Sequence, residues 1–495
     1  MMICAVINGP TFEEARQQIA QAAVSADLVE LRLDCFSALK MDALNTLRSQ
    51  FSIPMIFTLR SQSHGGNYDR SEEERLTAIL SLMELEPEYF DLENHVTSSI
   101  IDTISSRFPE IRLILSYHNF NETPADLEKI YQEMKKAPAF FYKIAMYANN
   151  CLDAMRLICW AKQEDDRLIA ISMGPHGQIS RILGPLIKSP ITYAALEEDQ
   201  QTVSGQLSVK SLIERYHYRC LNPSTTIYGL IGDPVHQSIS DETHNHLMEV
   251  CHLNSVYLKI KVKPGELKVF LEFAKQLPFH GLSVTMPLKE HILPFLDEID
   301  SKAAAIGAVN TLLFDNGKIF GFNTDCSGAL NAIEKDYTVK GKKIMIIGAG
   351  GAAKAIAYEA QRRGGLVTIV SRNAKKALEA ARGMNCKSYG LDNIEASSEA
   401  RYDIIINCTP VCPPIAFTYI LPQTIVMDIT TKPKETLFLQ HAKEKGCRVI
   451  YGYQMFIEQA LGQFKLWSRQ SIDMDQRRKI LEKRALQALF RQGEH

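Results

Sequence analysis

The sequence has little that would mark a membrane protein, a nucleic-acid-binding protein or a disulfide-linked protein. No apolar run reaches the roughly 18 residues of a membrane-spanning helix, and a net charge of −2 leaves no basic excess to neutralise phosphates. The eleven cysteines are scattered without a CxxC pair, which argues against a zinc site and favours a reducing, cytoplasmic location. The N-terminus has no basic leader and is typical of a strand followed by a helix, so we expect no signal peptide.

Two histidines lie close together, at His244 and His246, and metal ligation is one interpretation of such a pair. On a helix, however, residues two apart point to different faces. We therefore expect no metal site.

Residues 1–216 alternate short apolar strands with amphipathic helical stretches in eight units. Such alternation is typical of a parallel sheet that helices cover on both faces. Eight units in this length favour a closed (β/α)8 TIM barrel, with an open, doubly wound sheet as the alternative. The predicted strands are 3–8, 28–34, 54–60, 89–93, 112–119, 140–146, 167–174 and 191–196.

A break in this pattern follows at 215–226, where Asn222-Pro223-Ser224 is a turn signal. A second α/β pattern begins after it, a third section opens at 339–360, and the stretch from about Met455 is helical. A chain of 495 residues is too long for one core. The predicted domains are 1–220, 226–330, 331–455 and 456–495.

In a (β/α)8 barrel the reacting groups sit at the C-terminal ends of the strands, and here those ends are polar. Taken singly, each residue is explained by an ion pair or a solvated strand end, but together they predict an active site. Three arginines among them indicate an anionic substrate such as a carboxylate. The residues are Glu30, Arg32, Arg60, Ser116, Tyr117, His118, Lys143, Ser180 and Arg181.

Lys143 is the most informative of these, because it lies within the apolar run FFYKIAM. Burying an unpaired ammonium is costly, which favours the neutral amine. A neutral amine attacks a carbonyl to give a Schiff base. His118, one strand away, is then a natural general acid and base.

Six motifs occur in order in this half: ELRLD, FTLR…GG, SYHNF…TP, YKIA, MGPHGQISR and SGQ. Together they resemble the type I 3-dehydroquinate dehydratases. The resemblance implies that Lys143 forms the imine with the C3 ketone of 3-dehydroquinate, and that His118 removes the C2 proton and assists loss of the C1 hydroxyl. It implies that Arg181 and Gln206 hold the substrate carboxylate and hydroxyls. The pocket would be completed by Glu30, Arg32 and Arg60.

Two positions depart from that family's pattern. His64 precedes Gly65-Gly66 where many bacterial members carry a glutamate, and Asn119 follows His118 where an aspartate is usual. The second change removes a carboxylate that could orient His118 or raise its pKa. We expect a shifted pH profile with activity retained.

In the second half, the strand KKIMIIG leads into a glycine-rich loop and then a helix. The glycines permit a tight turn and the close approach of a pyrophosphate to the helix N-terminus. The next strand ends in Ser371-Arg372-Asn373 instead of an acid that would hold the ribose of NAD, and a guanidinium suits a 2′-phosphate. We therefore expect NADP (NADPH), with a cofactor-free Rossmann-like fold as the alternative. The loop residues are Gly348, Ala349, Gly350, Gly351 and Ala352.

Hydride transfer to a ketone needs a proton donor near the carbonyl. The segment 281–289 ends in Lys289, and the segment 321–325 ends in Asp325. An ammonium beside a carboxylate can donate a proton while the carboxylate orients it. Taken alone, each is explained as a helix-entry lysine or a turn aspartate.

Together with Ser238-Ile239-Ser240 and 307–311, these segments resemble shikimate dehydrogenase over about residues 226–470. The resemblance implies a two-domain module with a Rossmann NADP-binding domain, whose final helices return to the substrate domain. Lys289 and Asp325 would be the catalytic pair. The implied substrate residues are Ser238, Ser240, Thr285, Asn310 and Gln459. The implied cofactor residues are the loop 348–352, Ser371, Arg372, Thr409 and Gly452.

Four positions depart from this second pattern. Thr431 stands where a tyrosine is usual, Asp241 where a proline follows the Ser-x-Ser motif, Cys412 where a glycine is usual, and Ser283 where an asparagine is frequent. These changes bear on fine substrate preference and not on the reaction class.

The fused order resembles the bifunctional 3-dehydroquinate dehydratase/shikimate dehydrogenases of the shikimate pathway. It implies dehydration of 3-dehydroquinate to 3-dehydroshikimate, which is then reduced to shikimate with NADPH. Two alternatives stay open: a quinate/shikimate dehydrogenase fusion of catabolic role, and a non-catalytic sensor of the same ligands. We expect these small-molecule substrates as partners, with no nucleic acid and no membrane.

Overall fold

The computed structural model describes residues 1–198, 204–384, 386–393, 401–468 and 473–490. The chain forms two compact units. The first comprises Met1–Thr225 with Asn254–Val256 and Val269–Pro278, and the second comprises Thr226–Leu253, Tyr257–Lys268 and the chain from Phe279 onwards.

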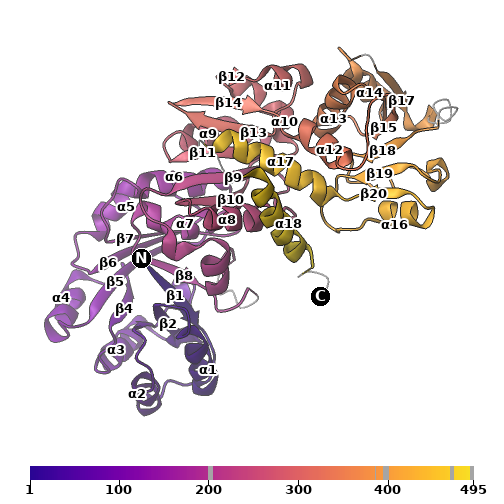
Figure 1. The fold of residues 1–495 in the computed structure, drawn as a ribbon. Coiled ribbons are helices and arrows are strands. Elements are labelled where there is room, and N and C mark those ends of the chain that lie inside the picture. The colour runs from indigo at the N-terminus through magenta and orange to yellow at the C-terminus, as the bar shows by residue number, and fades with distance from the viewer. Residues whose placement is uncertain (199–203, 385, 394–400, 469–472, 491–495) are drawn as a thin grey trace. The chain divides into compact units, whose positions relative to one another are not determined.

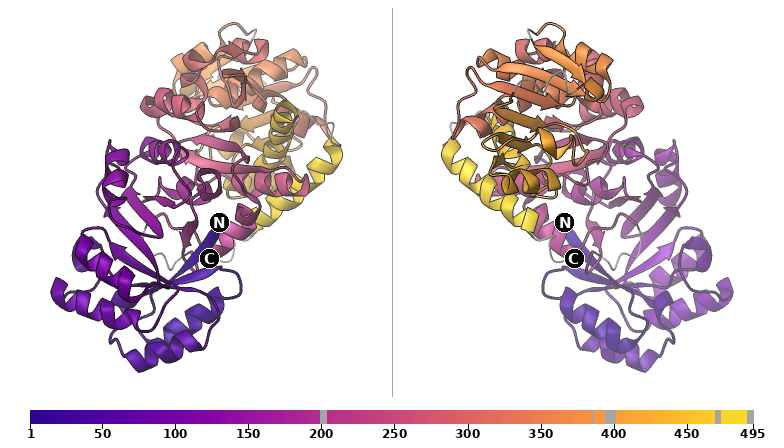
Figure 2. Two further views of the ribbon diagram at one scale, coloured as in Figure 1. Left: turned by 90° about the vertical axis from the view of Figure 1, so that its left-hand side faces the viewer. Right: turned by 90° about the vertical axis from the view of Figure 1, so that its right-hand side faces the viewer.

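The first unit is built on an eight-stranded parallel sheet, whose strands fan around a common centre with helices outside (Figure 1 and Figure 2). The order β7-β6-β5-β4-β3-β2-β1-β8 makes consecutive strands neighbours and nearly closes the sheet. It confirms the predicted (β/α)8 barrel over the doubly wound sheet, whose order reverses at a switch point. The strands are β1 (Met2–Ile7), β2 (Leu28–Arg32), β3 (Met55–Thr58), β4 (Tyr89–Glu93), β5 (Arg112–Asn119), β6 (Phe141–Tyr147), β7 (Leu168–Met173) and β8 (Ile191–Ala194). The helices are α1 (Phe12–Ala22), α2 (Met41–Ser49), α3 (Glu72–Met83), α4 (Ser98–Arg107), α5 (Leu127–Met134), α6 (Cys151–Ala161) and α7 (Gln178–Ile182).

Two features of the barrel's rim differ from the predictions. Arg60 lies two residues beyond the end of β3, which was predicted to reach residue 60, and Arg181 lies in the short helix α7 that follows β7 instead of at the strand end itself. Both residues are nevertheless buried. The predicted strands at 89–93 and 112–119 have the observed bounds.

The two-residue period of the strands sorts the barrel interior into layers. Near the N-terminal ends lie apolar side chains, which include Leu28, Ile56, Tyr89, Ile114 and Ile191. Two residues further along each strand, and therefore on the same face, stand Glu30, Thr58, Asp91, Ser116 and Tyr193. The apolar layer thus supports a polar layer towards the C-terminal ends, where Ser116 is in register with Lys143.

The second unit contains two six-stranded sheets. The first sheet has the order β10-β9-β11-β13-β14-β12 and mixes parallel with antiparallel pairs. Its strands are β9 (Thr226–Gly232), β10 (Ser255–Lys261), β11 (Phe279–Val284), β12 (Glu298–Ile299), β13 (Thr311–Asp315) and β14 (Lys318–Phe322). The helices along this stretch of sequence are α8 (Ser240–Val250), α9 (Leu267–Ala274), α10 (Leu288–His291), α11 (Ser301–Ile306) and α12 (Asp325–Glu334), and most of α9 belongs to the first unit.

The other sheet of the second unit is entirely parallel, with the order β17-β16-β15-β18-β19-β20. This order confirms the predicted Rossmann fold, in which the strand order reverses between β15 and β18 and ligands bind at that point. Its strands are β15 (Lys343–Ile347), β16 (Leu366–Ser371), β17 (Lys387–Gly390), β18 (Ile404–Asn407), β19 (Ile425–Asp428) and β20 (Arg448–Ile450). Its helices are α13 (Gly351–Arg362), α14 (Ala374–Ala381) and α16 (Leu437–Glu444).

Two long helices end the chain. Helix α17 (Gly452–Trp467) leaves the Rossmann sheet and packs against α12, β11 and β13, and α18 (Met474–Phe490) packs against α8 (Figure 1). Among the helices that the structure describes, none combines the length and the apolar character needed to span a bilayer.

Candidate active sites

Lys143 lies in the polar layer of the barrel and is 4% exposed. Its Nζ forms an ion pair with Asp91, lies 3.8 Å from Glu30 Oε1, and stands 4.5 Å from the centroid of the Tyr193 ring. The premise of an unpaired ammonium is therefore wrong, because carboxylates from β4 and β2 face this lysine. Tyr193 closes the other side of the amine with an aromatic face, which attracts a cation.

Asp91 is the centre of the charge cluster around Lys143. Its Oδ1 accepts hydrogen bonds from Arg60 Nη2 and from Ser116 Oγ, both at 2.6 Å. Burial raises the pKa of Asp91, but the charges of Arg60 and Lys143 outweigh burial and hold the pKa well below its usual range. The aspartate therefore stays ionised at neutral pH and anchors both cations.

A second carboxylate of the same strand extends the cluster outward. Glu93 Oε1 lies 3.3 Å from Arg60 Nη1, and its Oε2 accepts from Arg75 Nη1 at 2.7 Å. Arg75 is fully buried and also donates to Leu59 O and to Glu72. The guanidinium of Arg60 is thus fixed between two carboxylates, which makes it a rigid part of the pocket and not a mobile anion ligand.

His118 stands on β5 with its ring stacked on Phe120, at a centroid distance of 5.8 Å. Its Nδ1 is buried and has no hydrogen-bond partner among the described residues. Burial, followed by the charges of Arg60 and Lys143, lowers the pKa of His118 well below its ordinary value. The imidazole is therefore neutral at pH 7 and has a lone pair or proton free for a substrate.

The structure shows the contacts of Asn119 and His64, the two residues of the first half that depart from the type I dehydratase pattern. Asn119 Oδ1 accepts from the backbone N–H groups of Asn121 and Glu122, at 3.0 and 3.1 Å. Its side chain faces the side of β5 opposite to His118, because successive strand residues face opposite sides. The shifted pH profile expected from the lost carboxylate stays a prediction. The carboxylate that acts on His118 is Asp91. His64 stacks on His95 with ring centroids 4.3 Å apart.

Arg181 is a buried guanidinium without a counter-ion in the described part of the chain. It donates to Tyr193 O at 2.9 Å, and its Nε has no partner among the described residues. Burial lowers the pKa of Arg181 to about 10, so it remains cationic at pH 7. A buried, uncompensated cation is costly unless an anion arrives, which makes Arg181 the best candidate for the substrate carboxylate.

The remaining predicted residues of this site are held by their neighbours. Arg32 makes a bidentate pair with Asp34, at 3.0 and 2.8 Å, and Glu30 accepts from Thr58 Oγ1 at 2.8 Å. Gln206 is buried in the segment after β8. That segment passes the end of β7 closely, since a Cβ added at Gly205 would lie 2.0 Å from Gly174 O.

Sequence reasoning missed Asp91 and Glu93, which hold the barrel's cations in place. The available signal is their spacing, because two acids at alternate positions of the short apolar strand YFDLE face the same side as the lysine.

In the second unit, a cavity of about 980 Å³ lies at the C-terminal ends of strands from both sheets. The structure brings all the predicted residues of the second site to its walls. They are Ser238, Ser240, Thr285, Lys289, Asn310, Asp325, Gly348, Ala349, Gly350, Gly351, Ala352, Ser371, Arg372, Thr409, Gly452 and Gln459.

Lys289 and Asp325 form an ion pair at the floor of this cavity. Asp325 is the first residue of α12, where a carboxylate is favoured by the helix dipole. Its Oδ1 accepts from Asn310 Nδ2 at 2.8 Å, and Asn310 Oδ1 in turn accepts from the backbone N–H of Thr324 at 2.8 Å. The aspartate is thereby oriented towards the ammonium.

Ser238 and Ser240 form one hydroxyl pair, with Ser238 Oγ donating to Ser240 Oγ at 2.9 Å. Gln459 lies across the cavity on α17 and donates to Phe456 O at 3.0 Å. One turn further along, Gln463 was not predicted. Its Oε1 accepts from Ser283 Oγ at 3.0 Å, and its Nε2 donates to Thr311 Oγ1 at 3.1 Å. Its four-residue spacing from Gln459 is the signal that puts it on the same helix face.

The two histidines of α8, His244 and His246, lie on different faces of the helix, as helix geometry predicts. His244 is buried against Tyr257 and Phe464, and His246 is half-buried beside Glu249. Burial lowers the pKa of His244 to about 4, so it is neutral at pH 7.

The glycine-rich loop fits a dinucleotide pyrophosphate. A Cβ added at Gly350 would meet nothing within 4 Å, so this backbone is open at the start of α13. Gly348 has a φ of +124° and lies against Cys408 and Thr409 at the strand crossover. Arg372 lines the cavity after β16 and makes no ion pair within the described ranges. The guanidinium of Arg372 suits the 2′-phosphate of NADP, and the open glycine-rich loop suits its pyrophosphate.

Three family models match the chain in succession. One for type I 3-dehydroquinase matches residues 3–223, one for the shikimate dehydrogenase substrate binding domain matches 230–312, and one for shikimate / quinate 5-dehydrogenase matches 330–439. The matches cover the barrel and most strands of both sheets of the second unit.

Relatives match along the same two regions. The shikimate biosynthesis protein AroDE of Chlamydia pneumoniae is 40% identical over 94% of this chain and 95% of its own length. The chloroplastic bifunctional 3-dehydroquinate dehydratase/shikimate dehydrogenase of Arabidopsis thaliana is 32% identical over 94% of this chain and 82% of its own length. The shikimate dehydrogenase (NADP(+)) of Methanococcus aeolicus is 39% identical over 50% of this chain and 94% of its own length. The chain therefore belongs to the family of bifunctional enzymes in which a type I 3-dehydroquinate dehydratase precedes a shikimate dehydrogenase.

Proposed function

We propose that the barrel dehydrates 3-dehydroquinate through an imine on Lys143, and that the second unit reduces the resulting 3-dehydroshikimate to shikimate with NADPH. The observation that carries the proposal is that each unit presents one lysine, ion-paired with one aspartate, to a polar site. The relatives, whose names give shikimate biosynthesis or both activities, support it over a catabolic fusion. A sensor would have no need to keep both reactive pairs.

In the barrel, the uncompensated charge of Arg181 binds the substrate carboxylate and places the C3 ketone near Lys143. His118 accepts a proton from the ammonium of Lys143, and the amine attacks C3. The histidine returns this proton to the carbinolamine hydroxyl, which leaves as water, and the imine forms. His118, neutral in the resting site, accepts the C2 proton, and the electron pair moves into the imine nitrogen. The same histidine then returns the proton to the departing C1 hydroxyl, and water hydrolyses the imine to release the product.

In the cavity of the second unit, which we call the cleft, Ser238 and Ser240 bind the carboxylate of 3-dehydroshikimate, and Gln459 binds its hydroxyls. Lys289 donates a proton to the ketone oxygen as that oxygen becomes a hydroxyl, while Asp325 keeps the ammonium oriented. Asn310 fixes the aspartate. The glycine loop, Thr409 and Arg372 would hold NADPH, which would supply the hydride when bound.

A coupled assay on the whole chain tests this proposal. With 3-dehydroquinate alone, the absorbance of the enone product is expected to rise, and adding NADPH is expected to consume one equivalent of cofactor per enone. Binding of both ligands without turnover would overturn the proposal in favour of a sensor. Oxidation of quinate with NADP+ as efficient as that of shikimate would instead support the catabolic alternative.

A further inference from the structure

A buried carboxylate stands directly behind the two serines of the reduction site. Asp241 follows Ser240 in the first turn of α8 and is 1% exposed. The serines themselves are neutral, and Ser238 Oγ accepts from the Ser240 N–H at 3.2 Å as well as donating to its hydroxyl. An uncompensated anion so close to the serines would repel a substrate carboxylate.

Lys259, on β10, compensates this anion from the other side. Its Nζ lies 3.1 Å from Asp241 Oδ1 and donates to Ser238 O, also at 3.1 Å. One ammonium therefore touches both ends of the segment from Ser238 to Asp241. It cancels the buried negative charge and fixes the backbone that carries the first serine.

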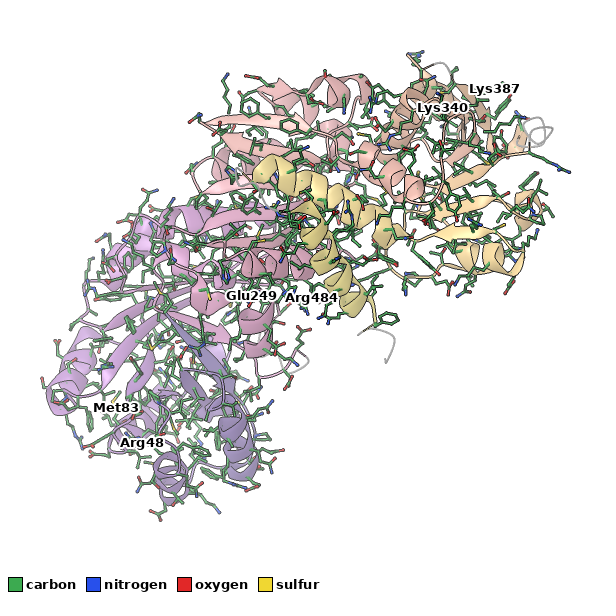
Figure 3. All side chains as sticks on the ribbon, viewed as in Figure 1. Arg48, Met83, Glu249, Lys340, Lys387 and Arg484 are labelled. Carbon is green, nitrogen blue, oxygen red and sulfur yellow. The ribbon has the colours of Figure 1, made fainter. Side chains whose placement is uncertain are left out.

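The helix does not need this ion pair to stay in place. Asn245 anchors α8 to β10 by donating to Tyr257 O at 2.8 Å and accepting from its N–H at 2.7 Å. On its outer side α8 packs against α18, where Arg484 lies 3.7 Å from Glu242. Figure 3 labels Glu249 and Arg484 on these two helices. The charge pair is thus an addition to an already anchored element.

We propose that Lys259 and Asp241 are positioning residues that set the electrostatic potential at the carboxylate-binding serines. Neither residue lines the cavity, so they act through Ser238 and Ser240 and not by touching the substrate. The inference rests on the proposed function, in which these serines bind the carboxylate of 3-dehydroshikimate. It also gives Asp241, a departure from the usual proline, a defined partner.

Three variants of the full chain test this proposal: Lys259→Met, Asp241→Asn and the double variant. Lys259→Met leaves Asp241 uncompensated, so the KM for 3-dehydroshikimate is expected to rise roughly tenfold or more, with kcat and the KM for NADPH unchanged. Asp241→Asn alone is expected not to raise this KM, because the remaining charge attracts the substrate. In the double variant the KM is expected to return to within about threefold of the parent.

If Lys259 and Asp241 only stabilise the fold, the KM values of the three variants follow a different pattern. Both single variants would then raise the KM and the double variant would be as impaired as either, which overturns the proposal, as does an unchanged KM for Lys259→Met. Oxidation of shikimate methyl ester adds a charge-specific readout: Lys259→Met is expected to leave the KM of this uncharged substrate within about twofold. An equal rise for acid and ester would contradict the electrostatic role.

Ser238→Ala separates this inference from the proposed function. If Ser238→Ala raises the KM for 3-dehydroshikimate and Lys259→Met does not, only the inference fails. If Ser238→Ala leaves the KM unchanged, the serine assignment fails and the inference with it. Dehydratase activity, measured on every variant, is expected to stay at the parent level and reports an intact first unit, and an unchanged reductase kcat reports an intact second unit.

Discussion

The two units place the same pair of residue types in different surroundings. In the barrel, Lys143 is enclosed with Asp91 in a cluster that includes Arg60 and Glu30. In the cleft, the Lys289 side chain is 17% exposed, pairs with Asp325 and faces a large cavity. Enclosure suits a nucleophile such as Lys143, because the amine must keep one position through several covalent steps. Partial exposure suits a proton donor such as Lys289, because the ammonium must reach the substrate and then be reprotonated from solvent. The surroundings, and not the lysine–aspartate pair itself, therefore set the chemistry.

In the proposed mechanism the units also differ in how they recognise the carboxylate that their substrates share. The barrel would use the buried guanidinium of Arg181, which has no counter-ion in the described residues. The second unit would use the neutral hydroxyls of Ser238 and Ser240, next to the compensated charge pair of Asp241 and Lys259. Direct charge binds an anion strongly, while hydroxyls bind it more weakly and allow release.

The largest expected effect is that of Lys143→Ala. Without the amine no imine forms, so dehydratase kcat is expected to fall by roughly 10⁴-fold or more, while reduction of 3-dehydroshikimate continues at the parent rate. Lys143→Arg is the matched variant, because it keeps a cation beside Asp91 but cannot form the imine, and it is expected to be equally inactive. Dehydration within tenfold of the parent in either variant would contradict the mechanism.

Lys289→Ala is expected to have the next largest effect. Loss of the proton donor lowers the reductase kcat by roughly 10²- to 10⁴-fold, and enone formation from 3-dehydroquinate is unchanged. Lys318→Ala, which removes a surface lysine paired with Glu298, serves as the control and should leave both rates within about twofold. Mixing the Lys143→Ala and Lys289→Ala proteins should restore flux from 3-dehydroquinate to shikimate.

Substitution of Asp91 and of Asp325 compares how much each lysine–aspartate pair contributes to the free energy of unfolding of its unit. Asp91→Asn takes the nearest carboxylate from two buried cations, Lys143 and Arg60, and leaves each with one more distant carboxylate. The first unit is therefore expected to lose roughly 3–5 kcal/mol. Asp325→Asn should cost unit 2 only about 1 kcal/mol, because Lys289 can turn to the cavity. Each unit has one tryptophan, Trp160 and Trp467, so urea unfolding followed by fluorescence of Trp467→Phe and Trp160→Phe backgrounds resolves the two. Equal losses of unfolding free energy in the two variants would show that the Lys143–Asp91 and Lys289–Asp325 pairs are equally enclosed, contrary to this comparison.

The smallest expected effect is on the pH profile of the dehydratase. The base form of His118 must be neutral, and its pKa is lowered well below the ordinary 6.5 by burial and by Arg60 and Lys143. As the pH falls, activity is therefore expected to persist through 6.5 and to decline only at lower pH. An acid limb of kcat/KM centred at or above 6.5 would show that His118 is not the titrating base.

Much of this architecture follows from local sequence patterns. The strands at 89–93 and 112–119 match the predicted bounds because apolar runs flanked by helix signals are unambiguous. The second site could be predicted as a set, since most of its motifs follow the C-terminal end of a strand and such ends converge at one edge of a sheet. Asn310 reaches the same edge because it directly precedes β13, which is antiparallel to β11 and β14. Gln459 comes from a distant helix and was reached only through the family resemblance.

The partners of the charged residues could not be predicted from the sequence. Asp91 meets Lys143 through strand pairings that link β4 to β6 by way of β5, and those contacts depend on register across three strands. The pairing of Lys259 with Asp241 likewise joins a strand to the start of a helix. Which ions meet, and which cation such as Arg181 is left without a counter-ion, is decided by the assembled barrel or cleft.

The most direct test of two lysines with different chemistry is borohydride reduction of the whole enzyme during turnover of 3-dehydroquinate, followed by peptide mass spectrometry. The account predicts one stable adduct, on Lys143, and an unmodified Lys289 whether or not NADPH is present. An adduct on Lys289, or continued dehydration with no adduct on Lys143, would contradict it.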